Sequence, residues 1–374
     1  MNAQVAVVRC GTYDIQNVFE TVNRALSPFG GMGRFVKPGQ TVLLKPNMLS
    51  ARQPDRGVTT HPSVLEAVVR EVQAAGAGAV WIGDSPSGAL KGVRRCWENT
   101  GFLKVSEETG AKLINFEAGG TIQKEVNGRL YHLARAVFEA DVVINLPKFK
   151  THGVTLYTGA VKNLFGTLPG FQKAKFHKQF PNPTQFSRVL TEIYSLVRPA
   201  LTIMDGILGM EGNGPSTGLL RNTGLILAGP NGIALDALAA AIMGFKENEV
   251  DTTRIAGEMG LGETKLSSIE VIGDSLESVR FKDFALPSNR LMKLVPTFLV
   301  HWLGRFVWVK PRADLAKCTG CGICVRSCPV NAIRFIEGRP ATDYKICINC
   351  LCCNESCPED AVVQEMSWLA RRIG

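Results

Sequence analysis

Two stretches near the C-terminus, CTGCGICVRSCP (318–329) and CINCLCCNESCP (347–358), share one cysteine spacing. Each places four cysteines as C-x2-C-x2-C-x3-C and has a proline directly after the fourth. The second stretch begins 29 residues after the first, and the pair Ala332–Ile333 recurs in step as Ala361–Val362. This internal duplication predicts a small domain built from two similar halves.

The spacing is typical of thiolate ligands for two 4Fe-4S clusters. Three closely spaced thiolates in a turning loop bind three irons of one cubane, and the fourth reaches the other cluster. Gly320 and Gly322 let backbone amides approach the sulfurs. The predicted ligands are Cys318, Cys321, Cys324 and Cys357 for the first cluster, and Cys347, Cys350, Cys353 and Cys328 for the second.

Zinc is the alternative metal for a cysteine-rich segment. Zinc sites use two CxxC pairs or mixtures of Cys and His, so two complete four-cysteine runs favour iron–sulfur clusters. Cys352 adjoins the ligand Cys353 and is expected to be a bystander, with ligand exchange as the alternative. Cys10 and Cys96 are isolated and are expected to be packed or surface thiols. The module resembles bacterial two-cluster ferredoxin domains over about residues 313–366, which implies a low reduction potential.

Before residue 285, short apolar runs alternate with segments of helical periodicity. The segments VAVVR and TVLLKPN are strand-like, whereas HPSVLEAVVREVQAA (61–75) and IALDALAAAIM (233–243) are helix-like. This alternation predicts an α/β fold with a mostly parallel sheet flanked by helices. The predicted order is an α/β domain (1–285), an apolar and basic connector (286–312), and a small α+β ferredoxin-like two-cluster iron–sulfur domain (313–374).

Polar residues collect directly after several predicted strands. They are Asn47, Asp84, Ser85, Lys148 and Asp205. Ligands of open parallel sheets bind beyond the carboxyl ends of the strands, so these side chains are expected to converge on one edge of the sheet.

Six segments of this part share a pattern with one known family. They are LLKPN (43–47), HP (61–62), GDSP (83–86), NLPKFKTH (145–152), GAVKNLFG (159–166) and GMEGNGP (209–215). Together they resemble the family called domain of unknown function 362 over about residues 3–280. The resemblance implies a C-terminal two-cluster ferredoxin module as a familiar partner of the domain, and it implies no established reaction.

The lysines after the ADVVINLP strand are expected to lie in a loop and a helix start, where they could bind a carboxylate or phosphate. A solvated charge run is the alternative. MDGILGMEGNGP is interpreted as a glycine-rich loop that wraps an anion or simply turns the chain. The candidate catalytic residues are Lys148, His152, Lys162, Asp205 and Glu211, and the candidate small-molecule pocket is Lys45, Asn47, Asp84, Ser85 and Asn163.

Two further segments carry open alternatives. His61 either reaches a ligand or caps the helix that begins at Pro62. The basic stretch 171–183 is expected to be a mobile flap over the pocket, with a disordered excursion as the alternative. Neither a P-loop nor a dinucleotide fingerprint in the right context is present.

The formal net charge of +9 is compatible with an acidic redox partner protein, an anionic small-molecule substrate or a membrane surface. Nucleic acid is not expected, because no basic tail, zinc-finger spacing or aromatic RNA-binding signature occurs. No signal peptide is visible, which predicts a cytoplasmic protein. Residues 291–309 are expected to pack between the domains, with peripheral membrane contact as the alternative.

Two functions follow from these patterns. The first is an oxidoreductase that passes low-potential electrons through two clusters to a small molecule or cofactor at the strand ends of the α/β domain. The second is a non-catalytic electron-transfer or assembly protein whose α/β domain docks a partner protein.

Overall fold

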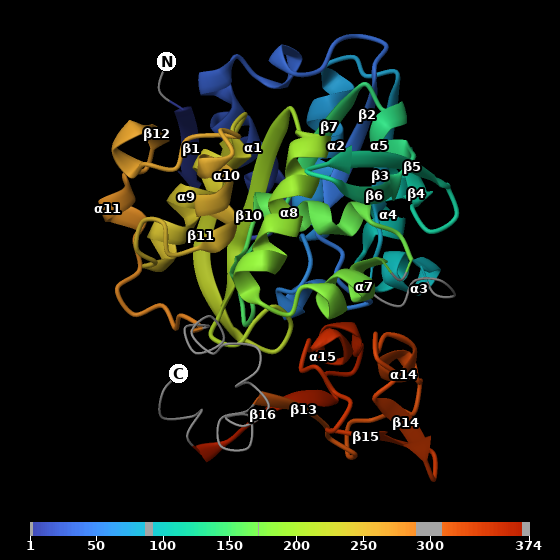
Figure 1. Ribbon diagram of the computed structural model, residues 1–374. Helices are drawn as coiled ribbons and strands as arrows, with labels where there is room; N and C mark the ends of the chain where they lie inside the picture. Colours follow the sequence, from blue (N-terminus) through green and yellow to red (C-terminus); the bar gives the residue numbers. More distant parts are fainter. Residues whose placement is uncertain (1–2, 87–92, 171, 289–308, 369–374) are drawn as a thin grey trace.

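A ten-stranded sheet forms the centre of the larger part of the chain (Figure 1). The computed structural model describes residues 3–86, 93–170, 172–288 and 309–368. The strand order is β12-β1-β11-β10-β7-β2-β3-β4, with β8 and β9 attached beside β10. The strands are β1 (Ala3–Arg9), β2 (Thr41–Pro46), β3 (Ala79–Asp84), β4 (Lys112–Asn115), β7 (Val142–Leu146), β8 (Lys148–His152), β9 (Leu156–Thr158), β10 (Leu201–Glu211), β11 (Leu219–Gly229) and β12 (Ile269–Gly273).

Most neighbouring strands run parallel, and β11 is antiparallel to both β1 and β10. The central strands β2 and β7 are continuous apolar runs that are buried on both faces, as parallel strands covered by helices require. A separate hairpin pairs β5 (Thr121–Val126) with β6 (Arg129–Ala134). The predicted α/β class with a mostly parallel sheet is confirmed.

Helices cover both faces of the sheet (Figure 1). On one face lie α1 (Ile15–Leu26), α2 (Pro62–Ala74), α3 (Val93–Asn99) and α4 (Phe102–Thr109). On the other lie α6 (Ala160–Asn163), α8 (Pro183–Val197), α9 (Gly232–Met243) and α10 (Asp251–Glu258). The remaining short helices here are α5 (Ala136–Glu139), α7 (Gln172–Gln179) and α11 (Leu276–Val279).

Three predictions about local structure are wrong. The segment KFKTH is strand β8 and not a loop, because β10 and β9 pair with it on its two sides. The segment MDGILGME belongs to strand β10, so the glycine-rich turn begins only at Gly212. Residues 172–179 form helix α7, because Phe176 and His177 are buried against α8 and outweigh the weak periodicity of the segment.

The small module repeats its backbone hydrogen bonds as it repeats its sequence. The amide of Asp314 donates to Ala361 O at 2.6 Å, and that of Asp343 donates to Ala332 O at 2.7 Å. Strand β13 (Val309–Ala313) pairs with β16 (Val362–Met366), and β14 (Ile333–Ile336) pairs with β15 (Arg339–Thr342). One short helix follows the start of each cysteine run: α14 (Ile323–Arg326) and α15 (Cys352–Ser356). Residues 309–312 of the predicted connector therefore belong to strand β13 of the module.

Most of the predicted membrane-contact segment, 291–309, lies outside the described residues. Within the described ranges no helix is both long enough and apolar enough to cross a membrane.

Helix α9 positions the short helix α6. Asn231 caps α9 by accepting from the amides of Ile233 and Ala234, and the helix is buried all round, as its apolar sequence requires. The Asp236 carboxylate of α9 accepts from Ala160 N at 2.7 Å and Val161 N at 3.0 Å, the first amides of α6. The position of Lys162 and Asn163 therefore depends on one buried carboxyl group.

Asp236→Asn tests this contact through pH dependence. Burial raises the pKa of Asp236 to about 7, so the folded chain holds a proton that the unfolded chain releases at lower pH. Wild-type stability from this group is therefore present below its unfolded pKa and is lost as pH rises through about 7. Urea unfolding of anaerobic protein measures the free energy of unfolding at each pH. Between about pH 5 and about pH 8 this free energy should fall less for Asp236→Asn than for wild type. The exposed Asp55→Asn is the control, and equal losses for wild type and Asp236→Asn would contradict the role.

Candidate functional site

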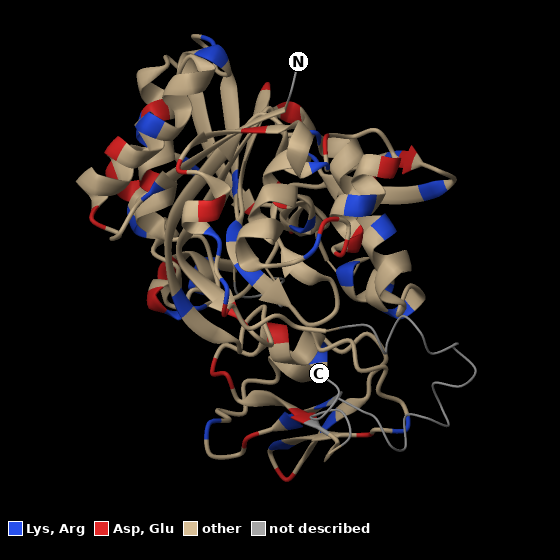
Figure 2. Cartoon of the chain, turned by 90° about the vertical axis from the view of Figure 1, so that its left-hand side faces the viewer, with Lys and Arg blue, Asp and Glu red and all other residues tan. Residues whose placement is uncertain are grey.

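The iron–sulfur module lies against the carboxyl ends of the parallel strands, with α15 turned towards the sheet (Figure 1). The side view places the module at the same end of the α/β part (Figure 2). Residues of the second cysteine run make the contacts that join the two parts. The contacts are Glu355 with His152, Asp360 with Arg52 and Arg56, Glu359 with Arg95, and the carbonyl of Cys357 with Arg52.

The closest link to the sheet is the contact between His152 and Glu355. His152 Nδ1 accepts from the amides of Val154 at 3.0 Å and Thr155 at 3.2 Å. The ring proton is therefore on Nε2, which donates to Glu355 Oε1 at 3.1 Å. Both side chains are buried.

The charges of this pair follow from its surroundings. Burial and the ammonium of Lys162 lower the pKa of His152 to about 4, against the opposing effect of Glu355. Burial acts to raise the pKa of Glu355, but the hydrogen bond from His152 and the charge of Lys162 hold that pKa below its ordinary value. At neutral pH a neutral imidazole therefore donates to an ionised carboxylate. His152 orients Glu355, and it has no spare proton for the predicted acid role.

Beneath α15 the sheet carries a network of buried amides and ammonium groups, here called the strand-end cluster. It comprises Lys45, Asn47, Asp84, Lys150, Lys162 and Asn163. Lys45 Nζ lies 3.0 Å from Asp84 Oδ1. Asn47 joins two elements, because its Nδ2 donates to Asn163 Oδ1 at 2.9 Å and its Oδ1 accepts from Lys150 Nζ at 3.0 Å.

Several polar atoms of this region have no protein partner. Lys162 is 9% exposed, and its ammonium makes no hydrogen bond to any described residue. The Oγ1 atoms of Thr59 and Thr158 are likewise buried and unpaired in the described part of the chain, and Thr158 is the β9 residue opposite Lys150. Buried polar groups are normally satisfied, so these orphaned donors are groups whose hydrogen bonds a bound polar species would complete.

Helix α7 adds a lysine that the sequence did not single out. Lys173 Nζ donates to Ser85 Oγ at 2.8 Å, and Ser85 in turn contacts Glu117. Burial lowers the pKa of Lys173, while the carboxylates of Asp84 and Glu117 act to raise it. The sequence did not single out Glu355 either. Its position between the predicted ligands Cys353 and Cys357 does not reveal that its side chain contacts His152.

Lys148 and Asp205 form a second polar group beside the strand-end cluster. Lys148 Nζ lies 2.7 Å from Asp205 Oδ2 and donates to the Tyr13 hydroxyl at 2.7 Å, which itself donates to Asp205 Oδ1 at 2.8 Å. The ring of Tyr13 stacks on His61 at 3.6 Å, and His61 Nδ1 caps α2 by accepting from Ser63 N. An open hollow of about 510 Å³ adjoins this group, lined by Tyr13, Gln53, Pro54, Asp55, His61 and Leu208.

The structure thus divides the predicted catalytic set. His152 and Lys162 lie beneath α15, and Lys148 and Asp205 lie beside Tyr13. Glu211 joins neither group, because its carboxylate lies 3.6 Å from Arg221 and accepts from Ala285 N at 3.2 Å. Glu211 stands at the carboxyl end of β10, beyond a register shift, and its role in the site stays a prediction.

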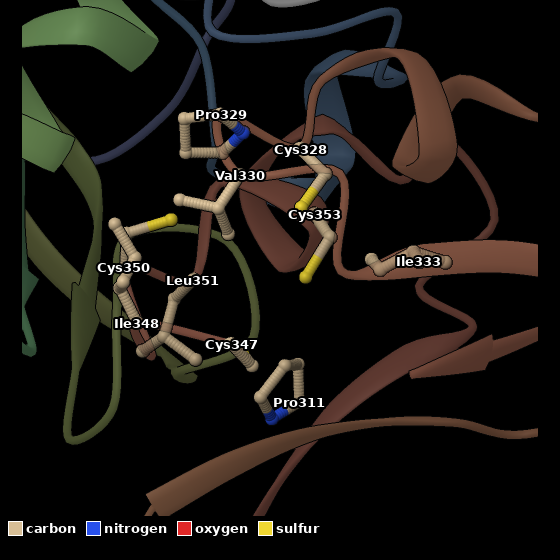
Figure 3. Close-up of a pocket in the computed structure, with 10 residues that line it drawn as sticks. All are labelled: Pro311, Cys328, Pro329, Val330, Ile333, Cys347, Ile348, Cys350, Leu351 and Cys353. Atoms are coloured by element: carbon tan, nitrogen blue, oxygen red, sulfur yellow. The ribbon is translucent and has the colours of Figure 1, made fainter. Parts of the chain in front are cut away.

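The cysteines of the module gather in two groups. Burial raises the pKa of Cys324 to about 11, with further contributions to this rise from the neighbouring thiols of Cys357, Cys321 and Cys318. A cavity is lined by Cys328, Cys347, Cys350 and Cys353, with Pro311, Pro329, Val330, Ile333, Ile348 and Leu351 (Figure 3). The two groups contain the cysteines of the two ligand sets predicted from the spacing, and their binding of clusters stays a prediction.

The chemistry of these thiols fits cubane clusters. Thiolates that hold a cubane surround a cavity, as Cys328, Cys347, Cys350 and Cys353 do here. Backbone amides approach the sulfurs: Ala332 N donates to Cys328 Sγ at 3.1 Å, and Ala361 N donates to Cys357 Sγ at 3.3 Å. In Figure 3 the sulfur of Cys350 stands apart from those of Cys328 and Cys353, and its thiol contacts Cys352.

Fold and site together define an iron–sulfur protein in which an α/β domain is joined to a ferredoxin-like module. The model of the 4Fe-4S binding domain matches residues 311–334, which gives the chain an electron-transfer role. The model of domain of unknown function 362 matches residues 42–241, more than half of the chain. The chain belongs to this DUF362 family.

Among the proteins similar to this chain are one relative and two solved structures. The thylakoid-associated protein of Synechocystis sp. is 37% identical over 71% of this chain and 82% of its own length. A solved structure from Thermotoga maritima has a TM-score of 0.38 and 12% identity, covering 67% of this chain and 60% of its own. The lactate racemase apoprotein of Thermoanaerobacterium thermosaccharolyticum has a TM-score of 0.39 and 10% identity, covering 64% and 57%. The chain thus spans about three fifths of each solved structure.

Arg52 and Arg56 provide a matched test of how the module is held. Both contact Asp360, but Arg52 is buried and also donates to the carbonyl of Cys357, whereas the Arg56 side chain is 55% exposed. Arg52→Met should lower the free energy of unfolding by about 3 kcal/mol. Arg56→Met should cost less than about 1 kcal/mol. Denaturant unfolding of anaerobically purified protein measures both, and equal costs would show that Arg52 does not hold the module.

Proposed function

We propose that this protein is an oxidoreductase that binds two 4Fe-4S clusters and reduces a small anionic molecule held in the strand-end cluster. One observation carries the proposal: helix α15 bears both Cys353, a predicted ligand, and Glu355, which is hydrogen-bonded to His152 of the sheet. Cys353 and Glu355 are two positions apart, so a very short stretch of chain connects the thiols of the module with the buried polar site. Such a short connection suits the passage of electrons into that site.

The two clusters, when bound, would each carry one electron. A two-electron reduction therefore discharges both and adds two protons to the substrate. Lys150 and Lys162 are the candidate proton donors, because burial lowers the pKa of each ammonium and makes it a stronger acid than an exposed lysine. Glu355 and His152 fix the geometry between module and sheet.

The charge of the site supports an anionic substrate. Lys150 donates to two neutral acceptors, Asn47 Oδ1 and the carbonyl of Val58, and Lys162 has no hydrogen-bond partner in the described chain. A carboxylate or phosphate would offer both ammonium groups charge-assisted hydrogen bonds. The buried Thr59 and Thr158 hydroxyls could donate to the same ligand.

The number of clusters and their ligands are tested by iron analysis. Anaerobically purified protein should contain about eight irons per chain. Cys357→Ala should remove the first cluster, and Cys328→Ala should remove the second. Each variant then keeps one cluster, and the electron paramagnetic resonance spectra of the two variants should differ. Cys352→Ala is the control and should keep all the iron. Loss of a cluster in Cys352→Ala would show instead that Cys352 is a ligand, and stoichiometric zinc would refute the proposal.

The anion site is tested with inorganic phosphate and short dicarboxylates. At least one of these anions should raise the midpoint of thermal unfolding of the wild-type protein, because a ligand that binds only the folded state stabilises it. Lys162→Met should weaken that binding by about tenfold or more, since it loses a hydrogen bond to a charged group. Lys178→Met, which changes an exposed lysine of α7, should behave as wild type. An equal response of both variants, with unchanged cluster absorbance, would contradict an anion site at Lys162.

A further inference from the structure

The two halves of the module carry opposite charges at equivalent positions. A shift of 29 residues relates the halves, so Arg326 of α14 corresponds to Glu355 of α15. By the same shift, Val330 and Asn331 correspond to Glu359 and Asp360. The second half thus presents three acids where the first half presents one base and two uncharged residues.

Each of the three acids of the second half binds the α/β domain. Glu355 contacts His152, Glu359 contacts Arg95, and Asp360 contacts Arg52 and Arg56. The face around α15 is therefore a docking surface for a basic partner, and that partner is the domain of the same chain. The equivalent face around α14 has no such acids and is exposed at Arg326.

The exposed face around α14, here called the outer face, surrounds the first cysteine loop. Arg326 donates to the carbonyl of Cys321 at 3.1 Å, and Cys321 is the exposed thiol of its group. The ring of Phe335 and the guanidinium of Arg326 both lie over Gly322, where an added Cβ would meet them at 3.1 and 2.9 Å. The outer face thus brings a basic and an aromatic side chain beside a predicted cluster ligand.

The hairpin of β14 and β15 extends the outer face. Phe335 is 42% exposed and Ile336 is 61% exposed. Arg334 and Arg339 are exposed and have no ion-pair partner within the described ranges, while Glu337 at the turn is the one acid of this hairpin. Apolar residues ringed by arginines are a feature of surfaces that bind other proteins.

We propose that the outer face, formed by Cys321, Arg326 and Phe335 together with the other side of the adjoining hairpin at Arg334, Ile336 and Arg339, is the docking site of an acidic electron-carrier protein. The inference rests on the proposed function in one respect, namely that the first cysteine group binds a cluster. The carrier loses one electron in each encounter and the first cluster gains it, so two encounters supply the two electrons of one reduction. Electrons therefore enter at the outer face and leave through the α15 face.

The chemistry of the surface favours an acidic carrier over other partners. Three arginines against one glutamate attract an acidic protein and speed its diffusional encounter. The exposed apolar area is limited to a few side chains, which suits the small interfaces of transient redox complexes. Association is therefore expected to be fast at low ionic strength and to weaken as salt screens the charges.

The test uses an acidic flavodoxin, reduced beforehand, as the electron donor to anaerobic full-length protein. Stopped-flow absorbance follows reduction of the clusters in wild type and in the double variant Arg326→Glu/Arg339→Glu. The charge reversal should slow reduction by flavodoxin about tenfold or more at low ionic strength. Reduction by the methyl viologen radical cation should not slow, because this small cation needs no docking surface.

Two controls keep the result interpretable. Lys246→Glu/Lys265→Glu makes the same charge change on exposed lysines of the α/β domain. Flavodoxin should reduce the clusters of this variant at the wild-type rate. Arg339→Glu alone, which removes no hydrogen bond of the cysteine loop, replaces the double variant if that variant loses iron. Docking at the outer face would be overturned by an unchanged flavodoxin rate, by equal slowing in the lysine control, or by a wild type that flavodoxin cannot reduce. Absence of clusters would refute the proposed function as well, and iron analysis separates that outcome from a failure of docking alone.

Discussion

A buried hydrogen bond from His152 Nε2 to Glu355 Oε1 joins the small module to the large sheet. An ionised carboxylate in such a position is tolerated only where donors and positive charge surround it, and His152 and Lys162 provide both. Since Glu355 lies on the same short helix as Cys353, the position of this carboxylate also sets where the second group of thiols stands relative to the lysines. The arrangement of thiols and polar site depends on this contact more than on any other.

Much of the strand-end cluster works against stability. Lys150 is buried with only neutral acceptors, and Lys162 is buried without a hydrogen bond in the described chain. Removing an ammonium group from water is costly, and apolar residues of similar size would fill the same space more cheaply. Ionisable groups held in this way gather at functional sites, where their altered pKa values and unpaired donors have a use. The energetics of the cluster therefore support a ligand site over a structural network.

The sequence predicted the large elements because their apolar periods are strong. It divided the cysteines into two crossed sets because the duplication repeats every ligand position, and cluster binding by these sets stays a prediction. It did not predict β8, whose lysines and histidine suggested a loop, although Lys148, Lys150 and His152 alternate as residues on one face of a strand do. It also could not reveal Lys173 or Glu355, because α7 folds only on packing against α8 and Glu355 meets the sheet across some 200 residues of chain.

The duplication also explains how one small module can serve two neighbours. A symmetric two-cluster module would present the same charge on both faces, so each face would attract the same kind of partner. Here the halves keep equivalent backbone hydrogen bonds at Asp314 and Asp343, while Arg326 and Glu355 have opposite signs at equivalent positions. The acidic face is occupied by basic residues of the same chain, which leaves the basic face for a partner of opposite charge. Cys321 is exposed on the outer face and Cys353 lies on α15, so the charge difference between the halves separates the face proposed for an outside partner from the face that meets the sheet.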